Sequence, residues 1–344
     1  MALSTQEIAA MRRALELAAS PDAPRSPNPR VGAVLLSPDG TVLAEGYHRG
    51  AGTAHAEVVA LARAGAAARG ATVVVTLEPC NHIGRSGSCA QALLAAGVRR
   101  VVFAQTDPNP IATGGADTLR SAGVDVESGY EAAEALALNE FWTFSMKHGR
   151  PFVTWKAAAT LDGRVAAADG TSRWITSAAA RAEVHALRAE VDAIMVGTGT
   201  VVADDPQLTV RDDMGATARV RQPLRVIIGK REIPAGSHVL DNAAPMLQLR
   251  THDPVEVLSV LQAREISSVI LEGGPTLAAA FVRAGLVDRV VWYVAPAVLG
   301  AGPSALADAG MSGIGDALRL QVTDVALVGT DVRIDARVPR LETS

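Results

Sequence analysis

The sequence predicts two α/β domains in one chain. Short apolar runs alternate with helical patterns along most of the 344 residues, which is the pattern of strands covered by helices. A chain of this length can hold two domains of ordinary size. The sequence Gly-Arg-Pro at 149–151 interrupts the helical pattern. We therefore expect one domain over 1–148 and a second over 149–344.

Composition and charge exclude several classes of protein. Apolar residues make up 49% of the chain and the net charge is only −4, which argues against a basic surface for nucleic acid and against an acidic disordered tail. No apolar run is long enough to span a bilayer, and residues 1–16 lack the apolar core of a signal peptide. Two cysteines cannot form a disulfide framework. These features predict a cytoplasmic protein without a nucleic-acid or membrane partner.

The first domain begins with an amphipathic helix, in which Ile8, Met11, Leu15 and Ala18 recur at helical spacing. Four prolines between 21 and 29 end this helix. Apolar and β-branched runs then predict strands, and the segments between them predict helices. The expected strands cover 31–36, 41–46, 71–77, 100–104 and 124–126. One expected helix starts near 54, and two others cover 90–96 and 131–147.

The stretch from His55 to Cys89 carries metal-ligand residues. His55, Cys80 and Cys89 supply one imidazole and two thiols, one ligand fewer than the four that close a structural zinc site. Glu57 follows the histidine by two residues, where its carboxylate can reach a water at the open position without being a ligand. Zinc lowers the pKa of such a water, and a neighbouring carboxylate can transfer protons.

Two interpretations of this stretch remain open. The order His-x-Glu followed by Pro-Cys is the signature of zinc-dependent nucleobase deaminases, with Zn²⁺ as cofactor and Glu57 as catalytic residue. Alternatively, His82 supplies a fourth ligand and the zinc is structural. Glu57 favours the catalytic interpretation, because a structural site does not need it. The spacing is unusual, since eight residues separate Cys80 from Cys89.

This long spacing, in Pro-Cys-Asn-His-Ile-Gly-Arg-Ser-Gly-Ser-Cys over 79–89, resembles the deaminase half of the bifunctional riboflavin-biosynthesis family. That family more often has Thr-Pro-Pro before the last cysteine, where this chain has Ser86-Gly87-Ser88. The resemblance implies a cytidine-deaminase-like, three-layer α/β/α domain. It also assigns substrate contacts to Asn28, His48 and Arg85.

A cation at Arg85 suits a substrate that carries a phosphate, because guanidinium binds phosphate in a bidentate fork. The alternative is that His48 and Arg85 are solvated loop residues. Glu78 is a weaker candidate, since a carboxylate directly before Pro-Cys can equally accept structural hydrogen bonds.

The second domain also alternates strands with helices. A helix over 181–190 is expected, with Ser177 or Thr176 as its N-cap. A strand leads into Gly273-Gly274 before a helix over 277–284, which is a possible anion site because bare backbone exposes the free N–H groups of the helix. This signal alone is weak, and the sequence contains no Rossmann fingerprint. The expected strands cover 152–158, 191–196, 224–228, 269–271 and 287–294.

The second half resembles the reductase domain of the same family, which is similar in fold to dihydrofolate reductase and uses NADPH. The motifs that carry this resemblance are Lys-Ala-Ala at 156–158, Leu-Asp-Gly-Arg at 161–164, Trp-Ile-Thr at 174–176, Gly-Thr-Gly-Thr at 197–200, Asp-Asp-Pro-Gln-Leu-Thr at 204–209 and Glu-Gly-Gly at 272–274. It places Lys156 beside the reacting centre. The implied NADPH contacts are Ala158, Trp174, Thr200, Asp204, Gly274, Pro275 and Thr276, and the implied substrate contacts are Ser172, Arg188, Leu208, Arg211 and Glu272.

Arg188 and Arg211 suit a substrate phosphate on charge grounds, whereas Lys156 and Asp204 could also form an ordinary ion pair at a strand end. Together the halves imply deamination of a diaminopyrimidinone ribosylamine phosphate and then reduction of its ribosyl group. The acid of the second step is either Lys156 or a water. The resemblance, which extends from about Glu7 to Leu299, also implies a homodimer through the second domain, and the apolar strand 287–294 is compatible with one.

Two other functions remain open. One is a zinc deaminase that acts on cytosine nucleosides or transfer RNA, although the balanced charge argues against RNA. The other is a nucleotide sensor in which zinc only holds the fold. Glu57 speaks against the sensor, since a structural site has no use for it.

Overall fold

The computed structural model describes residues 3–24, 26–82, 87–212, 216–218 and 221–339. The chain forms two compact units, Met1–Gly149 and Arg150–Ser344, and this division lies one residue from the expected boundary. No helix within the described ranges has the length and apolar character needed to cross a bilayer.

The first unit is built on a five-stranded sheet with the order β2-β1-β3-β4-β5. β1 (Gly32–Leu36) pairs antiparallel with β2 (Val42–Tyr47) and with β3 (Thr72–Leu77). β3, β4 (Arg100–Gln105) and β5 (Asp125–Ser128) run parallel. β1, β3 and β4 are buried along their whole length, as expected of strands that are covered on both faces.

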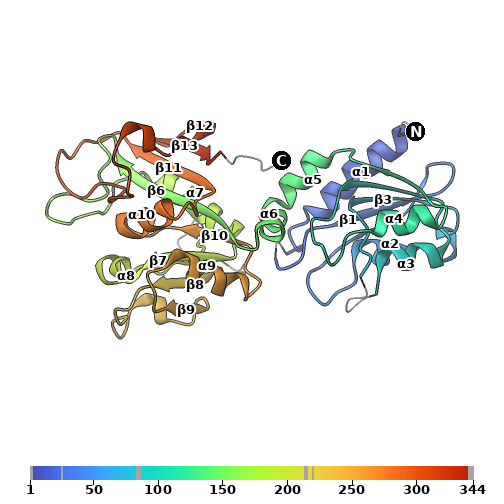
Figure 1. The fold of residues 1–344 in the computed structure, drawn as a ribbon, viewed down its shortest axis with the longest axis horizontal. Coiled ribbons are helices and arrows are strands. Elements are labelled where there is room, and N and C mark those ends of the chain that lie inside the picture. Colours follow the sequence, from blue (N-terminus) through green and yellow to red (C-terminus); the bar gives the residue numbers. More distant parts are fainter. Residues whose placement is uncertain (1–2, 25, 83–86, 213–215, 219–220, 340–344) are drawn as a thin grey trace. The chain divides into compact units, whose positions relative to one another are not determined.

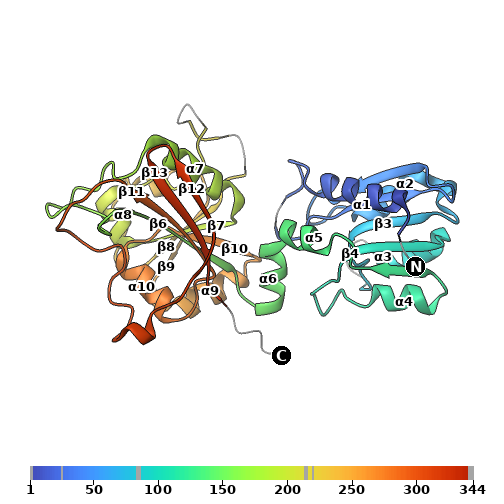
Figure 2. The same ribbon diagram turned by 90° about the horizontal axis from the view of Figure 1, so that it is seen from above.

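Helices cover both faces of this sheet (Figures 1 and 2). Buried side chains of α1 and α5 pack with Val34 and Val74, and those of α2, α3 and α4 pack with Leu35 and Val75. Neighbouring strand residues point to opposite faces, so one strand contributes to both cores. The three-layer α/β/α prediction is therefore confirmed. The helices are α1 Thr5–Ala18, α2 Ala56–Ala64, α3 Cys89–Ala96, α4 Gly115–Ser121, α5 Ala132–Leu138 and α6 Glu140–His148, with a short 3-10 helix at Gly65–Ala68.

The single helix expected over 131–147 is wrong, because the segment forms α5 and α6 with a break at Asn139. The Asn139 amide accepts a hydrogen bond from the Arg30 backbone N–H at 2.8 Å and donates one to the Arg30 carbonyl at 2.9 Å. These bonds hold Asn139 at φ −112°, outside the helical range. A contact distant in sequence thus overrides the local helical pattern.

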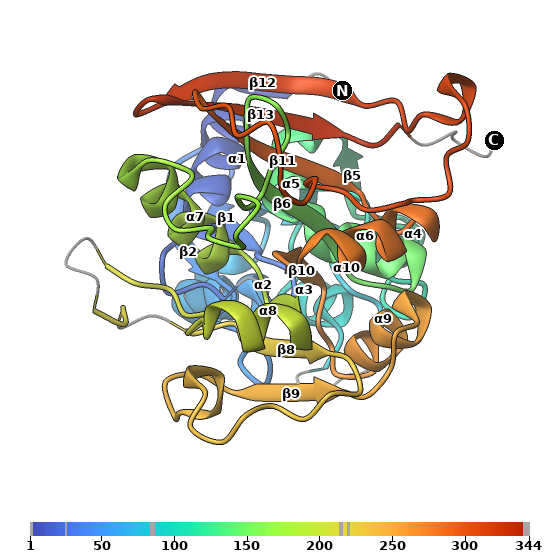
Figure 3. The same ribbon diagram turned by 90° about the vertical axis from the view of Figure 1, so that its left-hand side faces the viewer.

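The second unit contains an eight-stranded sheet with the order β12-β13-β11-β6-β10-β7-β8-β9 (Figure 3). The strands are β6 Phe152–Thr160, β7 Ala193–Gly197, β8 Leu224–Ile228, β9 Met246–Leu249, β10 Ser268–Leu271, β11 Arg289–Ala295, β12 Gln321–Val328 and β13 Asp331–Arg337. The six strands from β11 to β9 run parallel. At one edge, β13 pairs antiparallel with β11, and β12 pairs antiparallel with β13. The helices are α7 Ala178–Glu190, α8 Thr198–Asp204, α9 Pro254–Gln262 and α10 Pro275–Arg283, with 3-10 helices at His238–Leu240 and Ile314–Asp316.

The apolar strand considered for a dimer contact is β11, and it lies inside this sheet. β11 pairs with β13 on one side and with β6 on the other, so its backbone hydrogen-bonding groups face neighbours within the chain. Position in the sheet, which apolar character alone does not reveal, therefore rules out edge pairing through this strand.

Candidate functional site

The three predicted metal ligands converge in the first unit. The ligand atoms of His55, Cys80 and Cys89 all lie within 4.8 Å of one another. His55 is the N-cap of α2, and Cys89 is the first residue of α3. Cys80 follows the carboxyl end of β3, and its Sγ accepts a hydrogen bond from the Cys89 backbone N–H at 3.4 Å. A strand end and two helix N-termini thus form the cluster.

Glu57 lies beside this cluster and points toward it. It belongs to the first turn of α2 and is only 3% exposed. Burial raises the pKa of the Glu57 carboxyl group, and a hydrogen bond with the Cys89 thiol acts in the opposite direction. The carboxylate is therefore within reach of a molecule bound at the cluster.

The residues of the cluster fit a catalytic zinc ion. One imidazole and two thiolates are ligands that zinc prefers, and three of them leave a coordination position for water. Among the described residues the potential metal-binding group has three members, and His82, the alternative fourth ligand, is not one of them. The hydrogen bond from the Cys89 thiol lowers the pKa of Cys80, which favours the thiolate form that a cation binds.

Two of the predicted substrate residues lie next to the metal ligands. The rings of His48 and His55 meet edge to face with centroids 5.2 Å apart. His48 Nδ1 faces the Ala54 carbonyl at 3.1 Å and its Nε2 lies 2.9 Å from Asn28 Nδ2. Burial lowers the pKa of His48, so the neutral ring donates through Nδ1 and accepts from Asn28 through Nε2. This arrangement leaves the Asn28 Oδ1 as an acceptor for a ring substituent.

The remaining candidates of the first unit differ in outcome. Arg85 lies outside the described residues, so its assignment stays a prediction. Glu78 accepts hydrogen bonds from the backbone N–H groups of Asp107, Gly114 and Ala116 at 3.1 to 3.2 Å. Glu78 therefore has the structural role that the sequence left open.

A buried ion pair dominates the candidate site of the second unit. The Arg188 guanidinium binds both oxygens of the Glu272 carboxylate, at 2.7 and 2.9 Å. Burial opposes the charge on Glu272, but Arg188 outweighs this effect and lowers the pKa of Glu272 to about 2. Burial lowers the pKa of Lys156, and the nearby Glu272 partly offsets the change. Lys156 therefore lies within electrostatic range of the pair.

The charges of this cluster favour an anionic ligand. Burial and then the like charge of Arg188 lower the pKa of Arg211. The cluster thus holds three cationic side chains, Lys156, Arg188 and Arg211, against the single carboxylate of Glu272. Three positive charges and one negative charge leave an excess of two, which matches the charge of a phosphate monoester of about −1.5 to −2.

The Glu272 pKa predicts acid lability of the second unit. The pKa is about 2 in the folded protein against an ordinary value of 4.5 for a glutamate, so the unfolded chain takes up this proton first as the pH falls. The stabilising contribution is complete above about pH 4.5 and is lost between about pH 4.5 and pH 2, for a total of about 3 kcal/mol. Urea unfolding as a function of pH, followed by tryptophan fluorescence, measures this loss. E272Q should show a shallower dependence, and equal slopes for both proteins would contradict the assignment.

Several of the predicted cofactor residues follow the carboxyl ends of two neighbouring parallel strands, an edge where α/β sheets bind ligands. Thr200 and Asp204 follow β7, and Gly274 follows β10 as the N-cap of α10. α10 begins with Pro275 and Thr276. A Cβ built on Gly274 would lie 3.7 Å from the Thr200 Oγ1, so the N-terminus of this helix lies close to the Thr200 hydroxyl. This cradle fits a phosphate of a dinucleotide.

Other predicted residues of the second unit have separate environments. The Ser172 hydroxyl donates to the Asp204 carboxylate at 3.4 Å, and no ion pair joins Asp204 to Lys156 within the described residues. Trp174 is 71% exposed, with the Arg181 guanidinium 4.2 Å from its ring centroid. Ala158 on β6 packs beside Tyr293. These residues stay predicted cofactor and substrate contacts.

Next to the segment 207–211 lies His185, a residue that the sequence did not single out. Leu208 adopts φ +52°, and the Thr209 carbonyl accepts a hydrogen bond from Arg188 Nη1 at 3.1 Å. His185 lies one helical turn before Arg188, and its Nδ1 contacts the same segment. His185 and Arg188 are three residues apart and therefore lie on one face of α7. This spacing could have indicated His185, but only the fold shows which groups lie opposite its ring.

Comparison with known proteins identifies both units. The model of the cytidine and deoxycytidylate deaminase zinc-binding region matches residues 4–105, and that of the RibD C-terminal domain matches residues 151–334. The riboflavin biosynthesis protein RibD of Mycobacterium tuberculosis is 52% identical over 308 residues, which cover 89% of this chain and 90% of that relative. The match to the family thus extends beyond Leu299, the approximate end of the resemblance in the sequence analysis.

Solved structures agree with these matches. RibD of Acinetobacter baumannii is 38% identical with a TM-score of 0.86, covering 96% of this chain and 98% of that chain. A protein of Thermotoga maritima, described as a diaminohydroxyphosphoribosylaminopyrimidine deaminase/5-amino-6-(5-phosphoribosylamino)uracil reductase, is 32% identical with a TM-score of 0.85, covering 97% of this chain and 99% of that chain. The chain therefore belongs to the RibD family of bifunctional riboflavin biosynthesis proteins.

Proposed function

We propose that the two units catalyse consecutive steps of riboflavin biosynthesis. The first unit deaminates 2,5-diamino-6-(5-phosphoribosylamino)pyrimidin-4(3H)-one, and the second reduces the ribosyl group of 5-amino-6-(5-phosphoribosylamino)uracil to ribityl with NADPH. The observation that carries this proposal is the three-donor cluster of His55, Cys80 and Cys89 next to the buried Glu57. Family membership supports the pairing of the two activities.

In the deaminase step, His55, Cys80 and Cys89 would hold a zinc ion, which would supply an activated water. The Glu57 carboxylate takes up a proton and returns it to the departing ammonia, which its position beside the cluster allows. Asn28 presents its amide oxygen to the pyrimidine, because His48 holds the amide nitrogen. Binding of the ring edge by Asn28 orients the amine-bearing carbon toward the cluster.

In the reductase step, NADPH held beside Thr200 and Gly274 would supply the hydride that C1 of the opened ribosyl chain accepts. The guanidinium groups of Arg188 and Arg211 hold the substrate phosphate and thereby position C1 beside Lys156. Lys156 is the ammonium group of this cluster, and burial lowers its pKa, which makes it a better acid for the sugar oxygen. Thr200 and Gly274 form the phosphate cradle of the cofactor.

Separate assays of the two products test this function. Purified protein is given the diaminopyrimidine ribosylamine phosphate, and ammonia release and NADPH oxidation are followed independently. We expect ammonia without NADPH present, and NADPH oxidation only after ammonia has been released. Oxidation of NADPH without ammonia, or ammonia release from cytidine at a comparable kcat/KM, would contradict the assignment of the substrate.

We also propose that the protein acts in the cytoplasm as a homodimer formed through the second unit. Both cysteines belong to the metal cluster, which suits a reducing compartment. β12 forms an edge of the eight-stranded sheet, and its Val322, Val325 and Leu327 are 56%, 59% and 79% exposed. An apolar edge strand of this length promotes association unless a partner covers it.

Mass measurement tests the dimer. The double variant V325D/L327D should halve the mass found by light scattering, since two carboxylates would have to be buried without partners. L136D is the matched control, because Leu136 lies on α5 of the first unit and is 43% exposed. A monomeric wild type, or a dimer that tolerates both aspartates, would rule out this interface.

A further inference from the structure

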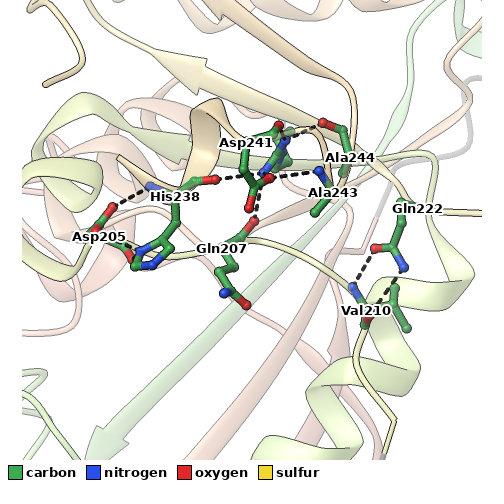
Figure 4. A network of polar contacts seen from close by, with 9 residues as sticks. Asp205, Gln207, Val210, Gln222, His238, Asp241, Ala243 and Ala244 are labelled. Carbon is green, nitrogen blue, oxygen red and sulfur yellow. Dashed lines mark hydrogen bonds and ion pairs between the residues drawn. The ribbon is translucent and has the colours of Figure 1, made fainter. Parts of the chain in front are cut away.

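The segment 207–211 is held in place by side chains from other elements. It lacks regular secondary structure except for a single bridge at Arg211. Arg225 donates to the Gln207 carbonyl at 3.4 Å, and Gln222 bonds the Val210 N–H at 2.8 Å and the Val210 carbonyl at 3.2 Å. Figure 4 shows Gln222 facing Val210, and Gln207 beside the network around Asp241. The conformation of this segment therefore depends on its side-chain partners.

His185 provides a further side-chain partner of this segment, beside Arg211. Its Nδ1 lies 3.2 Å from the Arg211 backbone nitrogen and 3.1 Å from the Thr209 carbonyl oxygen. One ring nitrogen either accepts or donates, so it serves one of these two groups at a time. The Thr209 carbonyl already accepts from Arg188. The Nδ1 lone pair is therefore best used by the Arg211 N–H, and the ring proton belongs on Nε2.

The surrounding charges keep this imidazole neutral. Burial lowers the pKa of His185, and the guanidinium groups of Arg188 and Arg211 lower it further. The Thr209 carbonyl and the Glu272 carboxylate act in the opposite direction but do not reverse the change. At neutral pH the ring thus remains an acceptor for the Arg211 N–H.

We infer that His185 is a positioning residue for the ribosyl phosphate, because its Nδ1 sets the backbone at Arg211 and thereby the direction of the Arg211 guanidinium. His185 and Arg188 lie on one face of α7, so one helix holds both sides of the anion site. Arg188 is held by Glu272, whereas Arg211 is held through its own backbone. This inference rests on the proposed reductase function.

Three substitutions at His185 separate positioning from general stability. Asparagine places its Oδ1 near the position of the histidine Nδ1 and can accept the same N–H, whereas glutamine places its polar atoms near Nε2 and alanine has none. With 5-amino-6-(5-phosphoribosylamino)uracil as substrate, H185A and H185Q should raise KM about tenfold. H185N should restore most of the affinity. The KM for NADPH and the rate of ammonia release should stay at the wild-type values.

The pH profile supplies a readout that a merely structural role would not change. Protonation of His185 in the wild type removes the acceptor, so KM should rise as the pH falls through the lowered pKa of the ring. H185N does not titrate in this range, and the titration of the substrate phosphate is common to both proteins. The ratio of wild-type KM to H185N KM should therefore increase on acidification.

Defined outcomes would overturn the inference. An unchanged substrate KM in H185A, equal losses in H185N and H185A, or a parallel rise in the KM for NADPH would each rule out positioning by His185 while the reductase function stands. If the wild type does not oxidise NADPH with this substrate, the proposed function fails, and the inference fails with it.

Discussion

Replacing Glu57 by glutamine should lower ammonia release by about a thousandfold or more, while zinc stays bound. The amide has nearly the same shape but cannot take up and return a proton. His55, Cys80 and Cys89 remain in place, so the metal content should not change. Ammonia release measured with an enzyme-coupled assay, together with zinc per chain by atomic absorption, tests this expectation.

Two comparisons make the E57Q result specific. E134Q is the matched control, because Glu134 is an exposed residue of α5. This variant should release ammonia at the wild-type rate. NADPH oxidation with the deaminated substrate should be unchanged in E57Q, since the reductase site belongs to the other unit. Loss of zinc or of folding in E57Q would instead favour a structural metal site, and normal ammonia release would exclude Glu57 as the proton carrier.

Replacing Arg188 by methionine should abolish the reductase activity and destabilise the second unit. The substitution removes a cation from the proposed phosphate site and leaves the Glu272 carboxylate, which has a side-chain exposure of 9%, without its bidentate partner. Breaking one side of a buried ion pair costs about 3 to 5 kcal/mol. NADPH oxidation and the free energy of unfolding of the second unit measure the two effects.

The double variant R188M/E272M separates stability from function. Apolar replacement of both partners removes the uncompensated charge, so much of the lost stability should return. The reductase activity should not return, because methionine at position 188 cannot donate hydrogen bonds to the substrate phosphate, even though Lys156 and Arg211 keep the excess of two positive charges. R319M is the control, since Arg319 is exposed. This substitution should change neither the reductase activity nor the free energy of unfolding. Recovery of activity in the double variant would show that Arg188 acts only through folding.

The family, the two-domain α/β fold and the bifunctional activity could all be predicted from the sequence. Zinc ligation requires residue types that are rare in combination, and the order His55, Glu57, Cys80 and Cys89 therefore carries much information. Continuous apolar runs such as β3 and β10 predict buried strands because every side chain lies against a core. These features depend on local sequence alone.

Other features depended on partners distant in the chain. The break at Asn139 follows from its bonds to Arg30, and the position of β11 inside the sheet follows from the pairing with β13. His185 has no motif of its own, and only the fold places the Arg211 backbone nitrogen at its Nδ1. Residue type and spacing do not contain this information.

The sequence by itself determined which chemistry this chain can perform, because thiols, imidazole and a carboxylate at these spacings suit few reactions. Only the tertiary structure decided which charged side chains face one another. Arg188, Glu272, Lys156 and Arg211 lie far apart in the chain, and their mutual effects on pKa arise from distances of a few ångströms in a buried site. Electrostatic interaction depends on separation in space and on burial, and both are set by the packing of the whole sheet.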